Sequence, residues 1–209
     1  MQQRVTDIED RLPRQGNAFT RWLGHFLLWL IGWRITGSLP NVPKAVVIGA
    51  PHTSNYDGLL ALASILALGV RINVLAKHTL FNGLGGVILR FLGCIPVNRQ
   101  AAHGLIEESA RKFDEHDELF LGMAPEGTRK AAERWKKGFY LIAHKAQVPI
   151  VVAVLDYGKK EVRLPLTLYP AGNYEADLQK ILACYGGAKA AKNEWLSLPL
   201  RELNANEHR

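Results

Sequence analysis

The feature that most constrains the fold is a series of short apolar runs that alternate with helical segments after Gly37. The runs have the length of buried strands, and the strongest is PIVVAVL at residues 149–155. Strands that alternate with helices form a mostly parallel sheet with helices on both faces. The expected strands cover residues 46–50, 72–76, 94–97, 119–124, 149–155 and 161–169, the last near an edge. The expected helices cover residues 58–68, 80–92, 101–113, 137–146 and 174–185.

This alternation predicts a single α/β domain with a mostly parallel mixed sheet covered by helices on both faces. The chain has 209 residues, of which 48% are hydrophobic, which is enough to build a sizeable core. We assign the domain to residues 38–185. A segment with an amphipathic helix precedes it at residues 1–37, and a polar tail follows it at residues 186–209.

The helix expected in the N-terminal segment carries a continuous apolar stripe. The stripe consists of Phe19, Trp22, Leu23, Phe26, Leu27, Leu30 and Ile31, and Trp29 and Trp33 flank it. The apolar residues 22–33 would span roughly 18 Å as a helix, which is short of the roughly 30 Å of a bilayer core. The helix therefore either lies in a membrane surface or packs on the domain. Its tryptophans and the positive charge of the chain favour the membrane.

Charge and cysteine content narrow the classes of partner. Lys and Arg number 26 against 19 Asp and Glu, a net charge of +7, which indicates a phosphate-bearing partner. The chain shows no zinc-finger spacing, RNP-like motif or recognition-helix pattern, so we expect no nucleic acid. Two cysteines exclude a disulfide framework and a Cys-rich zinc site, and we expect no metal. Acidic residues near the start argue against a signal peptide, so we expect the protein to face the cytosol.

The first group of residues that could carry chemistry follows the first expected strand. His52 and Asp57 lie in the turn before a helix, where an imidazole could accept a proton from a hydroxyl while a carboxylate holds its other nitrogen. A structural interpretation is also open, because Ser54 and Asp57 fit the capping pattern of a helix N-terminus. In that case His52 is an ordinary loop residue.

Two further groups follow other strands. Gly127, Thr128 and Arg129 combine a flexible turn, a hydroxyl and a planar guanidinium, a set suited to phosphate, and more basic residues follow. Arg99 comes after the strand at residues 94–97. Each could also be ordinary surface. Because parallel strands end at one edge of a sheet, we expect His52, Arg99 and Arg129 to converge there.

Four segments, in order, resemble the motifs of the glycerolipid acyltransferase family, which includes lysophosphatidate acyltransferases. His52 and Asp57 match its HxxxxD motif. Residues 93–99 resemble the second motif, whose arginine contacts the phosphate of the acceptor, and residues 125–129 resemble the third, PEGTR, also assigned to phosphate. Residues 148–151 resemble the fourth, near the acyl-binding region. The resemblance covers about residues 20 to 170.

The resemblance implies a membrane-associated O-acyltransferase of phospholipid biosynthesis, peripheral on the cytoplasmic face of an anionic membrane. It would move a fatty acyl group from acyl-CoA or acyl carrier protein to a lysophospholipid hydroxyl, first of all 1-acylglycerol-3-phosphate, giving phosphatidic acid. His52 would be the base, oriented by Asp57, and no cofactor would be bound besides the acyl donor. The acceptor phosphate would be held by Arg99, Glu126, Gly127, Thr128 and Arg129. Glu126 has an alternative role in orienting the others, because a carboxylate repels phosphate.

Two alternatives stay open at this stage. One is a non-catalytic phospholipid-binding protein of the membrane surface, in which His52 has no evident purpose. The other is an acyltransferase that uses a different lysolipid acceptor. An assay of acyl transfer separates the first alternative from the enzyme, and a panel of acceptors separates the second.

Overall fold

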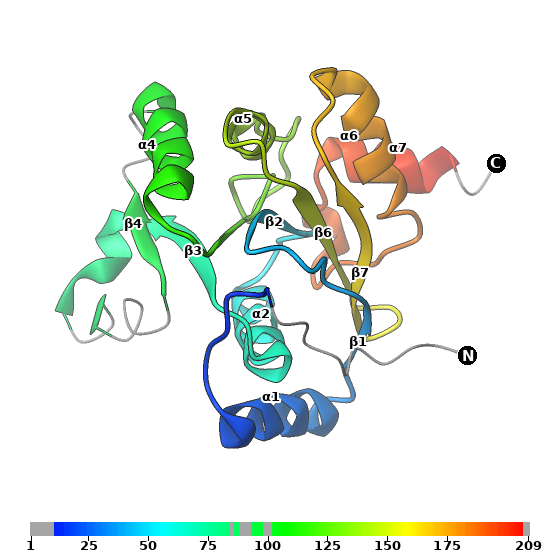
Figure 1. Cartoon of the computed structure of the whole chain (residues 1–209). Helices are drawn as coiled ribbons and strands as arrows, with labels where there is room; N and C mark the ends of the chain where they lie inside the picture. Colours follow the sequence, from blue (N-terminus) through cyan, green and yellow to red (C-terminus); the bar gives the residue numbers. More distant parts are fainter. Residues whose placement is uncertain (1–10, 84–85, 88–92, 98–101, 207–209) are drawn as a thin grey trace.

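The sheet stands between two layers of helices in the computed structural model, which describes residues 11–83, 86–87, 93–97 and 102–206 (Figure 1). Across these described residues the sheet has seven strands in the order β1-β7-β6-β2-β5-β3-β4. The strands are β1 (Arg34–Gly37), β2 (Lys44–Ala50), β3 (Ile72–Lys77), β4 (Ile95–Val97), β5 (Leu119–Met123), β6 (Ile150–Asp156) and β7 (Glu161–Leu168).

Strand direction divides the sheet into a parallel part and a mixed edge. β2 is parallel to both β5 and β6, and β3 is parallel to both β5 and β4. β7 returns antiparallel to β6, and β1 closes that edge parallel to β7. The expected mostly parallel mixed sheet is therefore confirmed. The carboxyl ends of β2, β3, β4, β5 and β6 all lie along one edge, which is where sites form in such sheets.

Successive side chains of a strand point to opposite faces of the sheet, so alternate residues of each central strand enter two separate cores. In β2, Val46 and Ile48 belong to the larger core, whereas Ala45 and Val47 belong to the core on the opposite face. β6 behaves in the same way, which explains why its sequence is apolar at nearly every position. A strand that is buried on both faces needs no polar alternation.

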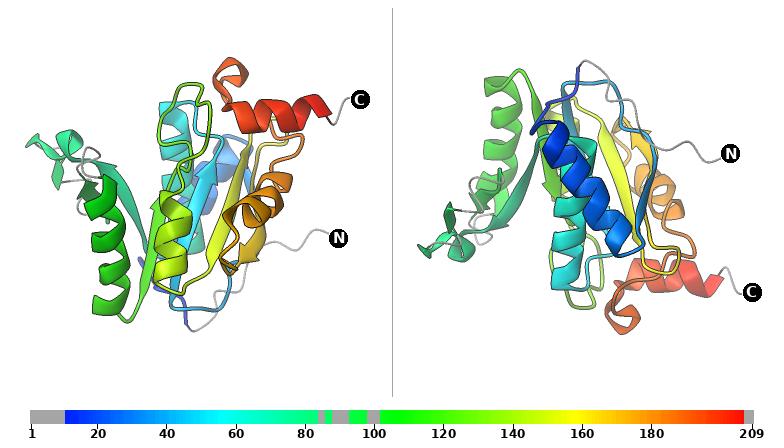
Figure 2. Two further views of the ribbon diagram at one scale, coloured as in Figure 1. Left: turned by 90° about the horizontal axis from the view of Figure 1, so that it is seen from above. Right: turned by 90° about the horizontal axis from the view of Figure 1, so that it is seen from below.

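Helices cover both faces of the sheet (Figure 2). One face carries α1 (Ala18–Leu30) and α2 (Asn55–Leu68). The other carries α4 (Ala102–Glu115), α5 (Gly138–Lys145), α6 (Tyr174–Ala183) and α7 (Leu198–Asn206). Two short 3₁₀ helices, η1 (His78–Phe81) and η2 (Asn193–Trp195), complete the described elements. The helix expected at residues 80–92 falls largely outside the described residues.

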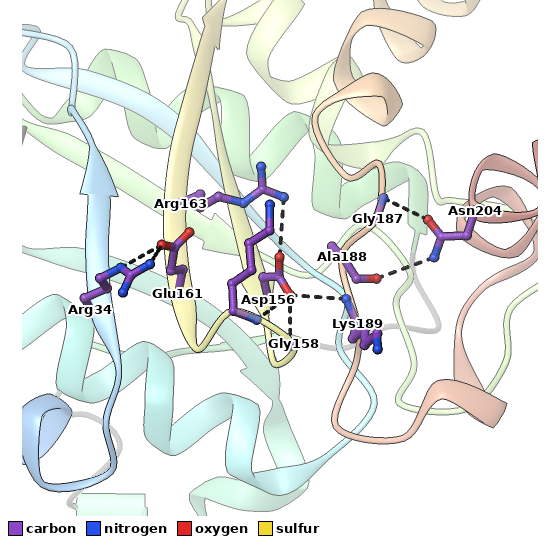
Figure 3. Close-up of polar contacts among 10 residues, drawn as sticks. Arg34, Asp156, Gly158, Glu161, Arg163, Gly187, Ala188, Lys189 and Asn204 are labelled. Atoms are coloured by element: carbon purple, nitrogen blue, oxygen red, sulfur yellow. Dashed lines mark hydrogen bonds and ion pairs between the residues drawn. The ribbon is translucent and has the colours of Figure 1, made fainter. Parts of the chain in front are cut away.

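Both ends of the chain contribute more to the fold than the sequence indicates. β1, from the N-terminal segment, extends the sheet beyond β7, and its Arg34 pairs with the buried Glu161 (Figure 3). Trp33, expected to flank a membrane-facing stripe, is instead buried in the core. The segment expected to be a polar tail forms η2 and α7, and it buries Leu196 and Leu200. Neither β1 nor α7 has enough apolar residues at strand or helix spacing to be recognised from its own short stretch of sequence.

α1 packs on α2 through a narrow contact and leaves its aromatic residues outside. Its buried positions are Gly24 and Leu28. Four aromatic rings stack along the outer side of the helix at centroid distances of 5.4–5.9 Å, namely those of Phe19, Trp22, Phe26 and Trp29. All four are exposed, Trp29 to 72%. No described helix is both long enough and apolar enough to cross a membrane.

The close approach of α1 and α2 gives a first prediction. A Cβ on Gly24 would lie 2.3 Å from the backbone nitrogen of Ala67, so Gly24→Ala forces the helices apart. We expect a loss of about 1–3 kcal/mol in the free energy of unfolding, measured by urea denaturation. Gly58→Ala is the matched control, because a Cβ on Gly58, also helical, meets no atom within 4 Å. It should be neutral or stabilising by up to about 1 kcal/mol. Equal stability of the two variants would contradict the packing described here.

Candidate active site

His52 and Asp57 form an imidazole–carboxylate pair at the carboxyl end of β2. The His52 Nδ1 atom lies 3.3 Å from Asp57 Oδ2. The imidazole is 30% exposed, whereas the carboxylate is 1% exposed. The pair therefore combines a partly exposed imidazole with a buried acid.

The start of α2 explains how Asp57 comes to lie there. Ser54 is the N-cap, and its hydroxyl accepts from the Tyr56 N–H (3.2 Å), while the Ser54 N–H donates to Asp57 Oδ2 (2.7 Å). This is the capping box that the sequence suggested as an alternative to catalysis. The same carboxylate oxygen faces His52, so the capping role and the pairing role are both real and do not compete.

Tyr157 completes the surroundings of Asp57 from a distant part of the chain. It follows β6 directly, and its hydroxyl donates to Asp57 Oδ1 (2.6 Å). The Tyr157 ring packs edge-on against Trp33, with centroids 4.8 Å apart. Tyr157 is not among the site residues predicted from the sequence. The available signal was its place just after the strongest predicted strand, on the edge where sites form.

The hydrogen bonds around Asp57 determine its charge. Burial raises the pKa of the carboxyl, but hydrogen bonds from His52, Tyr157 and the Ser54 and Thr53 N–H groups outweigh it, so the pKa is lowered. Burial and the bond to Asp57 raise the pKa of Tyr157, so the phenol stays protonated and donates. An ionised Asp57 favours the imidazole tautomer with its proton on Nδ1. Nε2 is then the nitrogen that can accept a proton.

Glu126 is buried, and its carboxyl group contacts the backbone of His52. The residue is 3% exposed, and its Oε2 atom accepts the His52 N–H (2.6 Å). Its Oε1 atom accepts the hydroxyl of Ser197 (3.1 Å), which in turn accepts the indole N–H of Trp135 (3.0 Å). Burial raises the pKa of Glu126 to about 7. Both oxygens of Glu126 are thus bonded inside the protein, where the carboxyl supports the His52 backbone, and its assignment to the acceptor-binding set stays a prediction.

The exposed loop after Glu126 carries three more of the predicted phosphate ligands. Gly127 has a positive φ of 66°, Thr128 accepts the Lys130 N–H (3.2 Å), and Arg129 is exposed. Residues 129–137 include five Lys or Arg and one Glu, so the loop is strongly positive. Because β5 runs parallel to its neighbour β2, this loop lies at the same sheet edge as His52.

Arg99 lies outside the described residues. Among the residues described, no group of His, Cys, Asp and Glu is arranged to hold a metal ion.

Comparisons with known proteins give one family. The model of a family described as Acyltransferase matches residues 34–156, more than half of the chain. A protein of Cocos nucifera named 1-acyl-sn-glycerol-3-phosphate acyltransferase is 31% identical over 150 residues, 68% of this chain and 47% of its own. The chain thus spans about half the length of that relative.

One solved structure has a similar fold. The 1-acyl-sn-glycerophosphate acyltransferase PlsC from Thermotoga maritima matches with a TM-score of 0.58 and 19% sequence identity. The match covers 91% of this chain and 79% of that protein. At this identity the likeness supports the fold: a mostly parallel sheet with helices on both faces.

The raised pKa of Glu126 gives a prediction about stability. In the unfolded chain Glu126 has an ordinary value near 4.5, whereas in the folded protein it is about 7. The folded protein therefore binds this proton more tightly, and its stability falls as pH rises from about 4.5 through about 7. The full effect is about 3 kcal/mol.

Urea denaturation at pH 5 and pH 8 measures this dependence. Glu126→Gln stays neutral, so it should lose less stability between the two pH values than the wild type does. Glu108→Gln, which changes an exposed glutamate on α4, is the control and should follow the wild type. If Glu126→Gln and the wild type show the same pH dependence, Glu126 does not carry the buried proton.

Proposed function

We propose, from the premise that the chain belongs to the acyltransferase family, that it is an O-acyltransferase that acylates a lysophospholipid. The donor is a fatty acyl thioester of coenzyme A or acyl carrier protein. The acceptor is the free hydroxyl of 1-acylglycerol-3-phosphate, and the product is phosphatidic acid. The observation that carries the proposal is the partly exposed His52 imidazole held by buried Asp57 at the carboxyl edge of the sheet.

His52 acts as the general base in this proposal. Its Nε2 atom removes the proton from the acceptor hydroxyl as the oxygen attacks the carbonyl carbon of the thioester. The tetrahedral intermediate collapses, the C–S bond breaks, and the thiolate takes up the proton from the imidazolium or from water. The ester remains on the acceptor. Direct attack needs no acyl-enzyme, and no cofactor beyond the acyl donor enters this sequence.

Asp57 stabilises the imidazolium that forms during the attack. Its charge lies 3.3 Å from Nδ1, in a buried place where such an interaction is stronger than in water. Tyr157 and the two N–H groups keep the carboxylate from rotating away. This arrangement supports a base that is oriented before the substrate arrives.

The basic loop supplies the acceptor-binding part of the proposal. Arg129 offers a planar fork for two phosphate oxygens, and Gly127 and Thr128 lie next to it in the turn. Arg99, the arginine of the second motif, is assigned to the same phosphate by the family resemblance. Glu126 is left out of this set, because its carboxylate supports the His52 backbone.

The exposed aromatic side of α1 supports the proposal that the protein binds the surface of an anionic membrane. Phe19, Trp22, Phe26 and Trp29 expose a continuous aromatic row, and amphipathic rings of this kind favour the lipid–water interface. The net charge of +7 adds attraction to anionic headgroups. The cytoplasmic leaflet carries such lipids, so the proposal makes the protein peripheral on that face.

The reaction is tested by mass spectrometry on the purified full-length chain. A panel of lysophospholipids is offered with acyl-CoA and acyl carrier protein donors in separate reactions. We expect acylation of 1-acylglycerol-3-phosphate, with turnover reduced roughly 10²–10⁴-fold by His52→Ala and an unchanged melting temperature. His116→Ala, at the exposed end of α4, is the matched control and should leave turnover unchanged.

Three results would change the proposal. Product from a different lysolipid alone would keep acyl transfer and replace the acceptor. If no pair of donor and acceptor gave product, the enzymatic function would be rejected and lipid binding would remain as the function. Turnover within a few-fold of wild type in folded His52→Ala would overturn the mechanism.

The membrane proposal is tested by changing exposed rings, because α1 also contributes Leu28 to the core and cannot be deleted cleanly. We expect the double variant W22S/W29S to bind anionic phospholipid vesicles at least about tenfold more weakly in sedimentation assays. Leu141→Ser is the control, since Leu141 is exposed on α5 across the sheet. Equal sedimentation of the double variant and the control would rule out α1 as the membrane-binding surface.

A further inference from the structure

A segment near the C-terminus, residues 187–197, runs along the carboxyl edge of the sheet beside the His52–Asp57 pair. The segment lies outside residues 34–156, which the family model matches. It contacts three different residues that each support the pair directly. We call this segment the C-terminal brace, and its contacts are taken in chain order.

The first contact fastens the brace to the end of β6, close to Tyr157. The Lys189 carbonyl accepts the Tyr157 N–H (2.9 Å), and the Lys189 N–H donates to the buried Asp156 at its Oδ1 atom (3.4 Å). Asn204 of α7 holds the turn before it by accepting the Gly187 N–H (3.2 Å) and donating to the Ala188 carbonyl (3.5 Å) (Figure 3). The backbone of Tyr157, whose hydroxyl bonds to Asp57, is thereby held from α7.

The second contact reaches the residue between His52 and the helix start. The Lys192 N–H donates to the hydroxyl oxygen of Thr53 (3.1 Å), and Thr53 is fully buried. The Thr53 N–H in turn donates to Asp57 Oδ2 (2.6 Å). The Thr53 N–H therefore holds the Asp57 carboxylate, while the Thr53 hydroxyl is held by the brace.

The third contact holds the backbone of His52 through Glu126. The Ser197 hydroxyl donates to Glu126 Oε1, and Glu126 Oε2 accepts the His52 N–H. Ser197 is 1% exposed and is itself positioned by the indole of Trp135. Because Leu196 beside it packs in the larger core, Ser197 has little freedom to move away.

We propose that the C-terminal brace positions the His52–Asp57 pair and that Ser197 is a positioning residue for the transfer reaction. The inference rests on the proposed function, because it assigns these contacts to the geometry of the base. Ser197 touches no reacting atom and acts only through Glu126 and the His52 backbone. A displacement of about 1 Å at a catalytic group can lower turnover roughly 10²-fold, so loss of one brace contact should be measurable.

The variant Ser197→Ala removes the hydroxyl that Glu126 and Trp135 share. Thr53→Val is a second, nearly isosteric variant that removes the acceptor for the Lys192 N–H and tests the brace at another point. Ser64→Ala is the matched control, because the buried Ser64 hydroxyl donates to the Leu60 carbonyl within α2. All three are made in the full chain.

Two measurements separate positioning from general stability. The first is the backbone amide resonance of His52 in a ¹⁵N–¹H spectrum of the protein without substrate, which reports on the bond to Glu126. The second is the split between kcat and KM for the acceptor. We expect Ser197→Ala to move the His52 resonance, and we expect both Ser197→Ala and Thr53→Val to lower kcat roughly tenfold, with KM changed less than about twofold.

The control should keep both the resonance and kcat of the wild type. The proposal is overturned if folded Ser197→Ala keeps the His52 resonance and turnover of the wild type, or if Ser64→Ala produces the same changes. If the wild type transfers no acyl group, the proposed function fails, and the His52 resonance alone then decides whether the brace positions this residue.

Discussion

The charge of one buried carboxylate, Asp57, organises the whole site. A buried carboxylate is costly unless donors surround it, and here the Thr53 N–H, the Ser54 N–H, the Tyr157 hydroxyl and the His52 ring all face it. Meeting this need brings together the first turn of α2, the end of β6 and the imidazole. Asp57 thus completes the capping box of α2 and also pairs with the His52 imidazole, and neither role can be changed without the other.

A second buried carboxylate, Glu126, lies on the other side of His52 and behaves differently. Hydrogen bonds lower the pKa of Asp57, whereas burial raises that of Glu126 to about 7. The difference follows from the donors: Glu126 receives the His52 N–H and the Ser197 hydroxyl, while Asp57 receives two N–H groups and the Tyr157 hydroxyl and also faces the His52 ring. One carboxylate therefore supplies charge to the imidazole, and the other supports the backbone that carries it.

The N-terminal segment serves the core and the surface at once. Gly24 and Leu28 of α1 and the ring of Trp33 are buried, and Trp33 packs against Tyr157, which bonds to Asp57. The aromatic row on the other side of α1 stays exposed. The side of α1 that carries Gly24 and Leu28 packs on the core, and the exposed aromatic side is the one on which the membrane proposal rests. A helix with a glycine contact on one side can leave its large side chains on the other.

The sequence by itself determined the α/β class, the main strands and the place of His52, Asp57 and the loop after Glu126, because strand and helix periodicities are local and parallel strands end at one edge. It did not reveal β1, α7, Tyr157 or Ser197, and it assigned Glu126 to the acceptor phosphate, with an orienting role as the alternative. Tyr157 reaches Asp57 across 100 residues and Ser197 reaches Glu126 across 71. No local pattern marks such partners, since each depends on where the folded sheet and the last helix place two distant parts of the chain. Only the tertiary structure decided which polar groups are buried together, and with them the charge of each carboxylate.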